Sequence, residues 1–293
     1  FLDYPNLVKD RDAARREGRW MGIGFASYAE LTGIGSRIAV APGMPINTGT
    51  ETSTIKIDAT GAITAAFGIS SHGQGLETTL AQVIADELGC RMEDIEVQHG
   101  DSALVPMGSG TYASRSAVLA GGAATMSSRV VKAKVLKAAA HLMGVPLDDL
   151  DASEGIVRSR TSNGSMTFKE IAHAVYAQMG RIPHDQREDL VASETYDPYF
   201  GTACSSTHLA LVEIDPETYG VTVRRYVVAE DCGRIINPMI VDGQVHGAVA
   251  QGIGAALLEE VVHDEDGQCV TASLADYLVP VATSLPEIGI VHI

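Results

Sequence analysis

The sequence predicts an α+β fold, in which mixed or antiparallel sheets carry helices packed on one side. Some stretches alternate in polarity with a period of two, as at 52–58, which is typical of strands. Others have apolar residues at helical spacing, as at 76–88. The strands come in hairpins, without regular strand–helix–strand alternation or a repeat of fixed length, which favours α+β over a parallel α/β sheet.

The first half of the chain contains a predicted hairpin followed by two helices. Ala59-Thr60-Gly61 is a turn between two strand-like stretches. Apolar residues then recur at helical spacing from Leu76 to Leu88, and Gly89 ends that helix. The expected elements are strands at 22–30, 52–58, 62–70 and 95–99, a loop at 32–50, and helices at 76–88 and 114–143.

The second half is expected to contain a capped helix, a linker, a hairpin and a glycine-rich helix. Thr167 is a suitable N-cap, and Glu170 completes a capping box. Asp242 is expected to cap the last helix. The expected elements are helices at 167–179 and 241–260, a loop or linker at 181–199, and strands at 205–215 and 222–230. We therefore expect two subdomains, 1–150 and 151–293.

The acidic composition limits the classes of partner. Lys plus Arg number 21 and Asp plus Glu number 37 among 293 residues, which gives a formal net charge of −16. That balance argues against a general nucleic-acid or membrane binder, and no apolar run reaches the roughly 18 residues that span a bilayer. The cysteines form no CxxC pair, so reduced thiols in a cytoplasmic protein are the simplest interpretation. The start at Phe1 suggests a fragment or a trimmed N-terminus.

The glycine-rich segment Ser71–Thr79 joins a predicted strand to a predicted helix. The free amides of the helix's first turn, together with the helix dipole, favour an anion there. Gly73 and Gly75 permit close approach, and Gln74 adds an amide that both donates and accepts. The absence of a Gly-Lys-Ser/Thr ending excludes the usual phosphate loop of NTPases. An ordinary, well-capped tight turn would explain the same residues.

The segment Gly108–Ser116 has the same design at the start of the longest predicted helix. Arg115 is its most informative residue, because a cation in the first turn opposes the helix dipole and calls for an anionic partner. Either a bound ligand or an acidic side chain elsewhere in the protein would satisfy it.

A third glycine-rich segment, Asp231–Gly247, leads into the last predicted helix. Asn237-Pro238 is a turn starter, and Gln244 lies in the first helical turn. Glycines that continue along this helix each cost roughly 1 kcal/mol of helix stability relative to Ala. Such glycines indicate that another helix or a ligand packs close to them.

Taken together and in this order, the three segments resemble the molybdopterin-binding large subunit of the xanthine dehydrogenase/aldehyde oxidase family. The likeness is strongest to its carbon monoxide dehydrogenase-like branch, and it covers nearly the whole chain. Further stretches look like landmarks of the same family, namely Glu30–Gly33, His99–Asp101, Gly110–Ser116, Asp276-Tyr277 and Leu285-Pro286.

The resemblance implies a cofactor and a reaction. The family's cofactor is molybdenum chelated by a molybdopterin, often in the cytosine dinucleotide form, and its members oxidise an aldehyde, an N-heterocycle or carbon monoxide with water as the oxygen source. Electrons then pass through iron–sulfur clusters to FAD on partner subunits or domains. The cofactor-binding residues that the resemblance implies are Gln74, Gly75, Thr78, Thr79, Thr111, Tyr112, Ser114, Arg115, Ser116, Asn237 and Gln244.

The family's catalytic base is a glutamate in a Gly-x-Gly-Glu motif, expected beyond Ile293, so no catalytic residue and no metal ligand is assigned in this chain. The chain is expected to be a C-terminal molybdopterin-binding portion, inactive alone. Its expected partners are iron–sulfur and flavin subunits and the remaining half of the molybdenum subunit, in a hetero-oligomer. The alternative is a non-catalytic scaffold or assembly subunit of the same fold that has lost cofactor binding.

Overall fold

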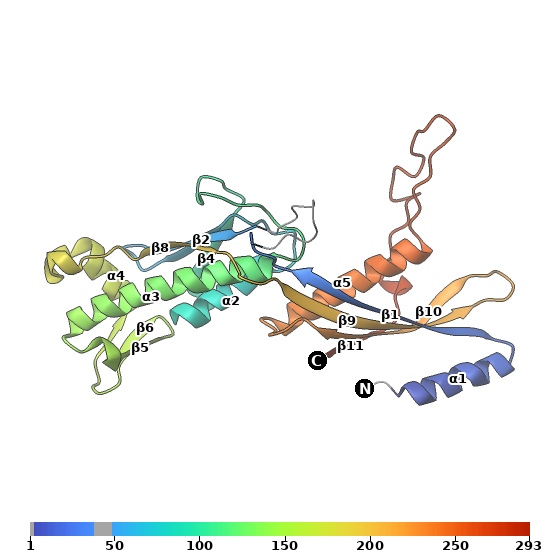
Figure 1. Ribbon diagram of the computed structural model, residues 1–293, viewed down its shortest axis with the longest axis horizontal. Helices are drawn as coiled ribbons and strands as arrows, with labels where there is room; N and C mark the ends of the chain where they lie inside the picture. The colour runs from blue at the N-terminus through green and yellow to red at the C-terminus, as the bar shows by residue number, and fades with distance from the viewer. Residues whose placement is uncertain (1–2, 38–48) are drawn as a thin grey trace. The chain divides into compact units, whose positions relative to one another are not determined.

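The computed structural model describes residues 3–37 and 49–293 (Figure 1). The chain forms two compact units, of which the first contains 1–30 and 203–293 and the second contains 31–202. The predicted subdomain boundary after residue 150 falls inside the second unit, where Leu150 begins a strand, so the compact units divide the chain at other residues. Residues 38–48 of the predicted loop at 32–50 lie outside the described residues.

The second unit is built on a mixed sheet with the strand order β4-β3-β2-β8. β2 is antiparallel to both β3 and β8, whereas β3 and β4 are parallel. The hairpin of β2 and β3 and the short strand β4 confirm the sequence predictions. The bounds are Glu51–Ile57 for β2, Ile63–Phe67 for β3, Ile95–His99 for β4 and Val191–Tyr196 for β8.

Two helices, α2 (Leu76–Leu88) and α3 (Gly121–Met143), cover one face of this sheet (Figure 1). Ile55 and Ile57 are fully buried in the core beneath them, whereas Lys56 between them is exposed. Successive strand residues point to opposite faces, so one face is packed and the other meets solvent. This arrangement confirms the predicted α+β class and, for this unit, the predicted packing of helices on one side. The same core contains Phe67, Leu76, Leu80, Ile84, Val131 and Val135.

Strand β8 corrects the sequence prediction, which placed a loop or linker at 181–199. Leu190 and Ala192 anchor it in the core at 1% and 6% exposure. The strand depends on pairing with β2, a contact between residues far apart in the sequence, and so little local patterning marks it. The segment before it forms the short 3-10 helices η4 (Met179–Arg181) and η5 (His184–Gln186).

A smaller antiparallel sheet, β5-β6-β7, and helix α4 complete the second unit. Helix α4 begins with the predicted capping box: the Glu170 N–H donates to Thr167 Oγ1 at 3.2 Å, and the Thr167 N–H donates to Glu170 Oε2 at 2.8 Å. The bounds are Leu150–Ser153 for β5, Ile156–Ser159 for β6, Ser165–Thr167 for β7 and Phe168–Ala177 for α4, with 3-10 helices η1 (Met92–Asp94) and η3 (Leu147–Asp149).

The first unit contains a second mixed sheet, β1-β9-β10-β11, with a helix on each face. β9 and β10 are antiparallel, and β10 and β11 are parallel. Val227 packs with Leu7 of α1, whereas the next residue, Val228, packs with Val245 of α5, so α1 and α5 lie on opposite faces. The bounds are Tyr4–Arg16 for α1, Trp20–Thr32 for β1, Thr202–Ile214 for β9, Val221–Asp231 for β10, Pro238–Leu257 for α5, Ala282–Ser284 for the 3-10 helix η6 and Ile288–His292 for β11.

Helix α5 begins earlier than the sequence predicted, and Asp242 is not its cap. Asn237 is the N-cap, since its Oδ1 accepts a hydrogen bond from the Ile240 N–H at 3.1 Å. Pro238 at the first helical position explains the early start, because its fixed φ suits the first turn and its missing N–H is not needed there. Among the described residues, no helix combines the length and the apolar character that crossing a bilayer requires.

The capping box gives a test of the fold. Replacing Thr167 with Ala should lower the free energy of unfolding by about 1 kcal/mol, because the first turn of α4 loses its side-chain acceptor. Urea denaturation followed by circular dichroism measures this loss. Thr167→Ser keeps the hydroxyl and should stay close to the parent protein; an equal loss in both variants would contradict the capping explanation.

Candidate functional site

The first two glycine-rich segments lie side by side in the second unit. Thr111 Oγ1 accepts a hydrogen bond from the Ser70 N–H at 3.1 Å and donates to the Ser70 carbonyl oxygen at 2.6 Å. Gly68 and Gly108 meet backbone to backbone, so that a Cβ on either glycine would overlap the other one. We call residues 68–75 and 105–116 the paired loops.

A buried ion pair joins the paired loops to the start of β2. Arg115 and Glu51 both have fully buried side chains, and Arg115 Nη1 lies 3.0 Å from Glu51 Oε2. The same guanidinium donates to the carbonyl oxygens of Gly110 at 2.5 Å and Thr50 at 2.7 Å. Glu51 Oε1 accepts from the Gly68 N–H at 3.0 Å. One carboxylate therefore fixes the first loop through Gly68 and the second through Arg115.

The ion pair identifies the anionic partner that the sequence predicted for Arg115. Of the two alternatives, the acidic side chain within the protein is the one found, and the sequence reasoning had missed Glu51. The only signal was indirect: a cation in a first helical turn calls for an anion. With 37 acidic residues in the chain, that requirement could not select one.

Helix α2 begins without a side-chain cap among the described residues. Its N-cap is Gly75, in the left-handed conformation at φ 74°, which glycine adopts without steric cost. Gln74 Oε1 accepts from the His72 N–H at 2.5 Å, which folds the loop back on itself. No N-cap side chain accepts from the first-turn amides of α2, although the Glu77 N–H bonds its own carboxylate. Amides at a helix start, together with the helix dipole, favour an anion.

The hydroxyl groups predicted to bind a cofactor occupy different environments. Thr78 and Ser114 are exposed, whereas Thr79 Oγ1 donates to the carbonyl oxygens of Gly75 and Leu76, at 3.2 and 3.0 Å. Tyr112 is 44% exposed, and its ring lies 5.5 Å from the Arg115 guanidinium. Ser116 differs from all of these, because its Oγ is buried and has no hydrogen-bond partner in the described part of the chain.

The backbone of the second loop is held in an unusual conformation. Ala113 and Ser114 have φ angles of 49° and 51°, in the left-handed region that residues other than glycine seldom occupy. The π turn η2 (Ser116–Ala120) follows directly and leads into α3. Strained residues and π turns both concentrate at functional sites, so this loop is a site candidate on its geometry as well as its composition.

Glu77, in the first turn of α2, has two side-chain hydrogen-bond partners. Glu77 accepts from Ser71 Oγ at 3.1 Å and lies 2.9 Å from His99 Nε2. The hydrogen bond from His99 holds the pKa of Glu77 below its usual range. The Arg115 charge is compensated by Glu51, so the second loop presents no uncompensated guanidinium.

The third segment belongs to the first unit. Asn237 is used as the cap of α5, and Gln244 is exposed about two turns along the helix, not in its first turn as the sequence predicted, because α5 begins at Pro238. A Cβ built on Gly243 or Gly247 would meet open space, so this side of α5 has no close neighbour among the described residues.

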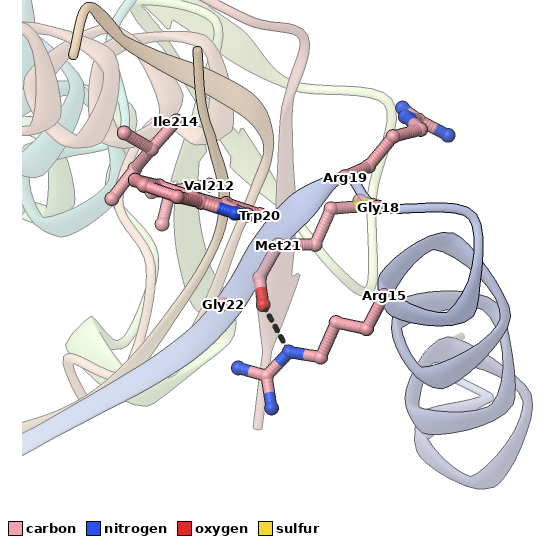
Figure 2. A pocket seen from close by; sticks show the side chains of 8 residues that line it. All are labelled: Arg15, Gly18, Arg19, Trp20, Met21, Gly22, Val212 and Ile214. Carbon is pink, nitrogen blue, oxygen red and sulfur yellow. Dashed lines mark hydrogen bonds between the residues drawn. The ribbon is translucent and has the colours of Figure 1, made fainter. Parts of the chain in front are cut away.

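The first unit also carries a pocket of about 480 Å³, which contains none of the predicted cofactor-binding residues. Figure 2 shows the Trp20 ring beside Val212 and Ile214, and Arg15 donating from Nε to the Met21 carbonyl oxygen at 2.7 Å. At its edge, Arg19 forms two hydrogen bonds to Glu213, 2.8 and 2.9 Å long, and holds the pKa of that carboxyl at about 2.

Comparison with known proteins shows which family the chain is similar to. The family model described as "Molybdopterin cofactor-binding domain" matches residues 2–286. The nicotine 6-hydroxylase large subunit of Paenarthrobacter nicotinovorans is 35% identical, over 100% of this chain and 36% of the relative. The carbon monoxide dehydrogenase large chain of Hydrogenophaga pseudoflava is also 35% identical, over 98% of this chain and 36% of the relative.

Solved structures of other proteins are similar to this chain over nearly its whole length. Quinoline 2-oxidoreductase from Pseudomonas putida 86 superimposes with a TM-score of 0.87 at 38% identity, covering 99% of this chain and 37% of that one. The copper- and molybdenum-containing CO dehydrogenase, in its carbon monoxide-reduced state, gives 0.85 at 33% identity with the same coverage. The chain therefore spans little more than a third of the length of the proteins it matches.

The buried ion pair can be tested by stability. Glu51→Ala should lower the free energy of unfolding by about 3–5 kcal/mol, because it leaves the Arg115 charge buried without its ion partner. Denaturant titration measures the loss. Glu51→Ala/Arg115→Met, which removes both charges, should recover part of it.

Glu87→Ala is the matched control, since Glu87 pairs with Arg129 in an ion pair whose side chains are 29% and 68% exposed. Its loss should stay within about 1 kcal/mol. If Glu51→Ala costs no more than Glu87→Ala, the paired loops do not depend on the buried ion pair.

Proposed function

Because the chain belongs to the molybdopterin cofactor-binding domain family, we propose that its paired loops hold part of a molybdopterin cofactor in a molybdenum hydroxylase. The observation that carries the proposal is the start of α2, which has no N-cap side chain, in contact with the η2 turn, whose Ser116 hydroxyl is buried without a partner among residues 3–37 and 49–293. Buried polar groups are almost always hydrogen-bonded, so an orphaned hydroxyl in a glycine-rich loop points to a missing ligand.

The donors of the paired loops fit an anionic pterin with a phosphate. Helix amides, the Gln74 side-chain amide and hydroxyl groups are neutral donors, which hold a phosphate without requiring a net positive pocket. The close contact of Gly68 with Gly108 keeps bulky side chains out of the junction between the loops. Because Glu51 neutralises Arg115, the site suits a ligand whose charge is met by oriented dipoles.

We divide the predicted residues by how they would act. Those with exposed or half-exposed side chains would contact the cofactor directly, and Ser116 would donate its free hydroxyl. Thr79, Thr111 and Arg115 are engaged inside the protein, so they would position the loops around it. Within the second unit, the direct contacts would come from Gln74, Gly75, Thr78, Tyr112, Ser114 and Ser116. For Asn237 and Gln244, in the first unit, cofactor binding is proposed on the family resemblance alone.

The proposed reaction is the oxidation of a small substrate, an aldehyde, an N-heterocycle or carbon monoxide. When bound, the molybdenum cofactor would supply the two-electron oxidation, with water as the source of oxygen. This chain's residues would bind and orient the pterin. We propose that it acts in the cytoplasm within a hetero-oligomer that includes the remaining molybdenum-subunit half and iron–sulfur and flavin subunits. The pterin would be in the cytosine dinucleotide form.

The test is cofactor content of the complex purified from its native host with its partner chains. The complex should contain molybdenum and pterin in equal amounts, and Gln74→Ala should lower both several-fold because a direct donor is lost. Thr78→Ala should act in the same direction. Elemental analysis and pterin fluorescence after oxidation measure the two components.

Gln186→Ala is the matched control, as Gln186 is an exposed glutamine in the short helix η5, outside the paired loops. Its cofactor content should equal that of the parent. A complex with neither molybdenum nor pterin would favour the non-catalytic scaffold instead. Full occupancy in both the Gln74 and the Thr78 variant would remove the assignment of these two residues while leaving the family's function open.

A further inference from the structure

Cys204 lies in β9 of the first unit, and Cys232 directly follows the neighbouring strand β10. β9 and β10 are antiparallel, and the last pair in their register is Asp231 opposite Ser205. Continuing that register by one residue places Cys232 opposite Cys204. Directly opposed residues in antiparallel strands point to the same face, with Cα atoms about 4.5–5.5 Å apart. That spacing lies within the range of about 4.4–6.8 Å that disulfides span.

These two thiols are also accessible, unlike a third. Cys204 is half-buried and Cys232 is exposed, and both are free thiols. Cys90 is buried in the core of the second unit, where burial raises the pKa of its thiol to about 12. Cys269 pairs in an isolated bridge with His263, and its sulfur lies 3.8 Å from Thr271 Oγ1. Of the four cysteines, Cys204 and Cys232 are therefore the two that are both accessible and at opposed positions of neighbouring strands.

The charged groups around the pair set how it reacts. Burial and the Glu30 carboxylate raise the pKa of Cys204. Burial and Glu230 raise the pKa of Cys232, with smaller contributions from Asp231 and from Cys204 itself. Glu230 in turn pairs with His292 of β11 at 2.9 Å. Because the thiolate is the reactive form, the pair reacts slowly at neutral pH and faster as the pH rises.

We propose that Cys204 and Cys232 form a reversible dithiol–disulfide couple that a hydroperoxide oxidises. The thiolate of one cysteine attacks the peroxide oxygen and becomes a sulfenic acid, releasing water or an alcohol. The thiolate of the other then attacks that sulfur, forming the S–S bond and releasing the sulfenic oxygen as water. In total the two thiols lose two electrons and two protons, and the hydroperoxide gains them. A small-molecule dithiol reverses the step by exchange.

Closing this disulfide would tie β9 to the start of the third glycine-rich segment. Cys232 lies in the turn where the Gly233 N–H donates to Asp231 Oδ1 at 2.9 Å, shortly before Asn237 caps α5. Oxidation therefore restrains the chain that enters α5, whatever ligand the segment holds. The couple is independent of the proposed function.

The experiment treats the intact complex with hydrogen peroxide, blocks remaining thiols with iodoacetamide and maps the peptides by mass spectrometry. We expect one linked peptide pair joining Cys204 to Cys232, lighter by about 2 Da than the two reduced peptides and separated by dithiothreitol. The rate of linkage should rise roughly tenfold per pH unit between pH 7 and pH 8, since the thiolate fraction rises by that factor below the thiol pKa.

Variants serve as controls. Cys232→Ser should abolish the linked pair, whereas Cys269→Ser should leave its yield unchanged. Unlinked sulfinic acids at both sites of the parent protein, or a link from Cys232 to Cys269, would overturn the proposal. The peptide map of the parent protein tests the link by itself, so the conclusion does not depend on how well a variant folds.

Discussion

The buried ion pair between Glu51 and Arg115 is the interaction on which the rest of the candidate site depends. Burying two charges costs several kcal/mol for each ion, and only near-complete hydrogen bonding offsets that cost. Here the offset comes from backbone groups of the paired loops: the Gly110 carbonyl, the Thr50 carbonyl and the Gly68 N–H. Those loops are therefore held in place by the requirement to keep both charges satisfied.

This pair also explains how an acidic chain can provide a site for an anion. The protein has a net charge of −16, and the one arginine in the paired loops is already neutralised by Glu51. What remains is a set of oriented neutral donors, formed by the uncapped start of α2 and the hydroxyls of the second loop. Such donors are fixed before a ligand arrives, so little ordering is lost on binding. The strained backbone at Ala113 and Ser114 is the structural cost of presenting them in this way.

The parts of the fold that the sequence predicted are those specified by neighbouring residues. The β2–β3 hairpin, helix α2 ending at Gly89 and the capping box at Thr167 each depend on a few consecutive side chains, and each is present. Strand β8 was missed because it exists through pairing with β2. The start of α5 was misplaced because Asp242 and Asn237 are both good caps, and only the following Pro238 distinguishes them. Glu51 was missed for a similar reason, since a buried acid is recognised by its partner, 64 residues away along the chain.

Hydrogen–deuterium exchange on the complex, with and without its cofactor, tests the central claim most directly. If the paired loops surround part of the cofactor, its presence should slow exchange at 71–79 and 110–116, while the hairpin at 263–269 should be unaffected. Exchange slows where amides are bonded or where local opening becomes rarer. Unchanged exchange in both loops, with protection confined to other segments, would contradict the account.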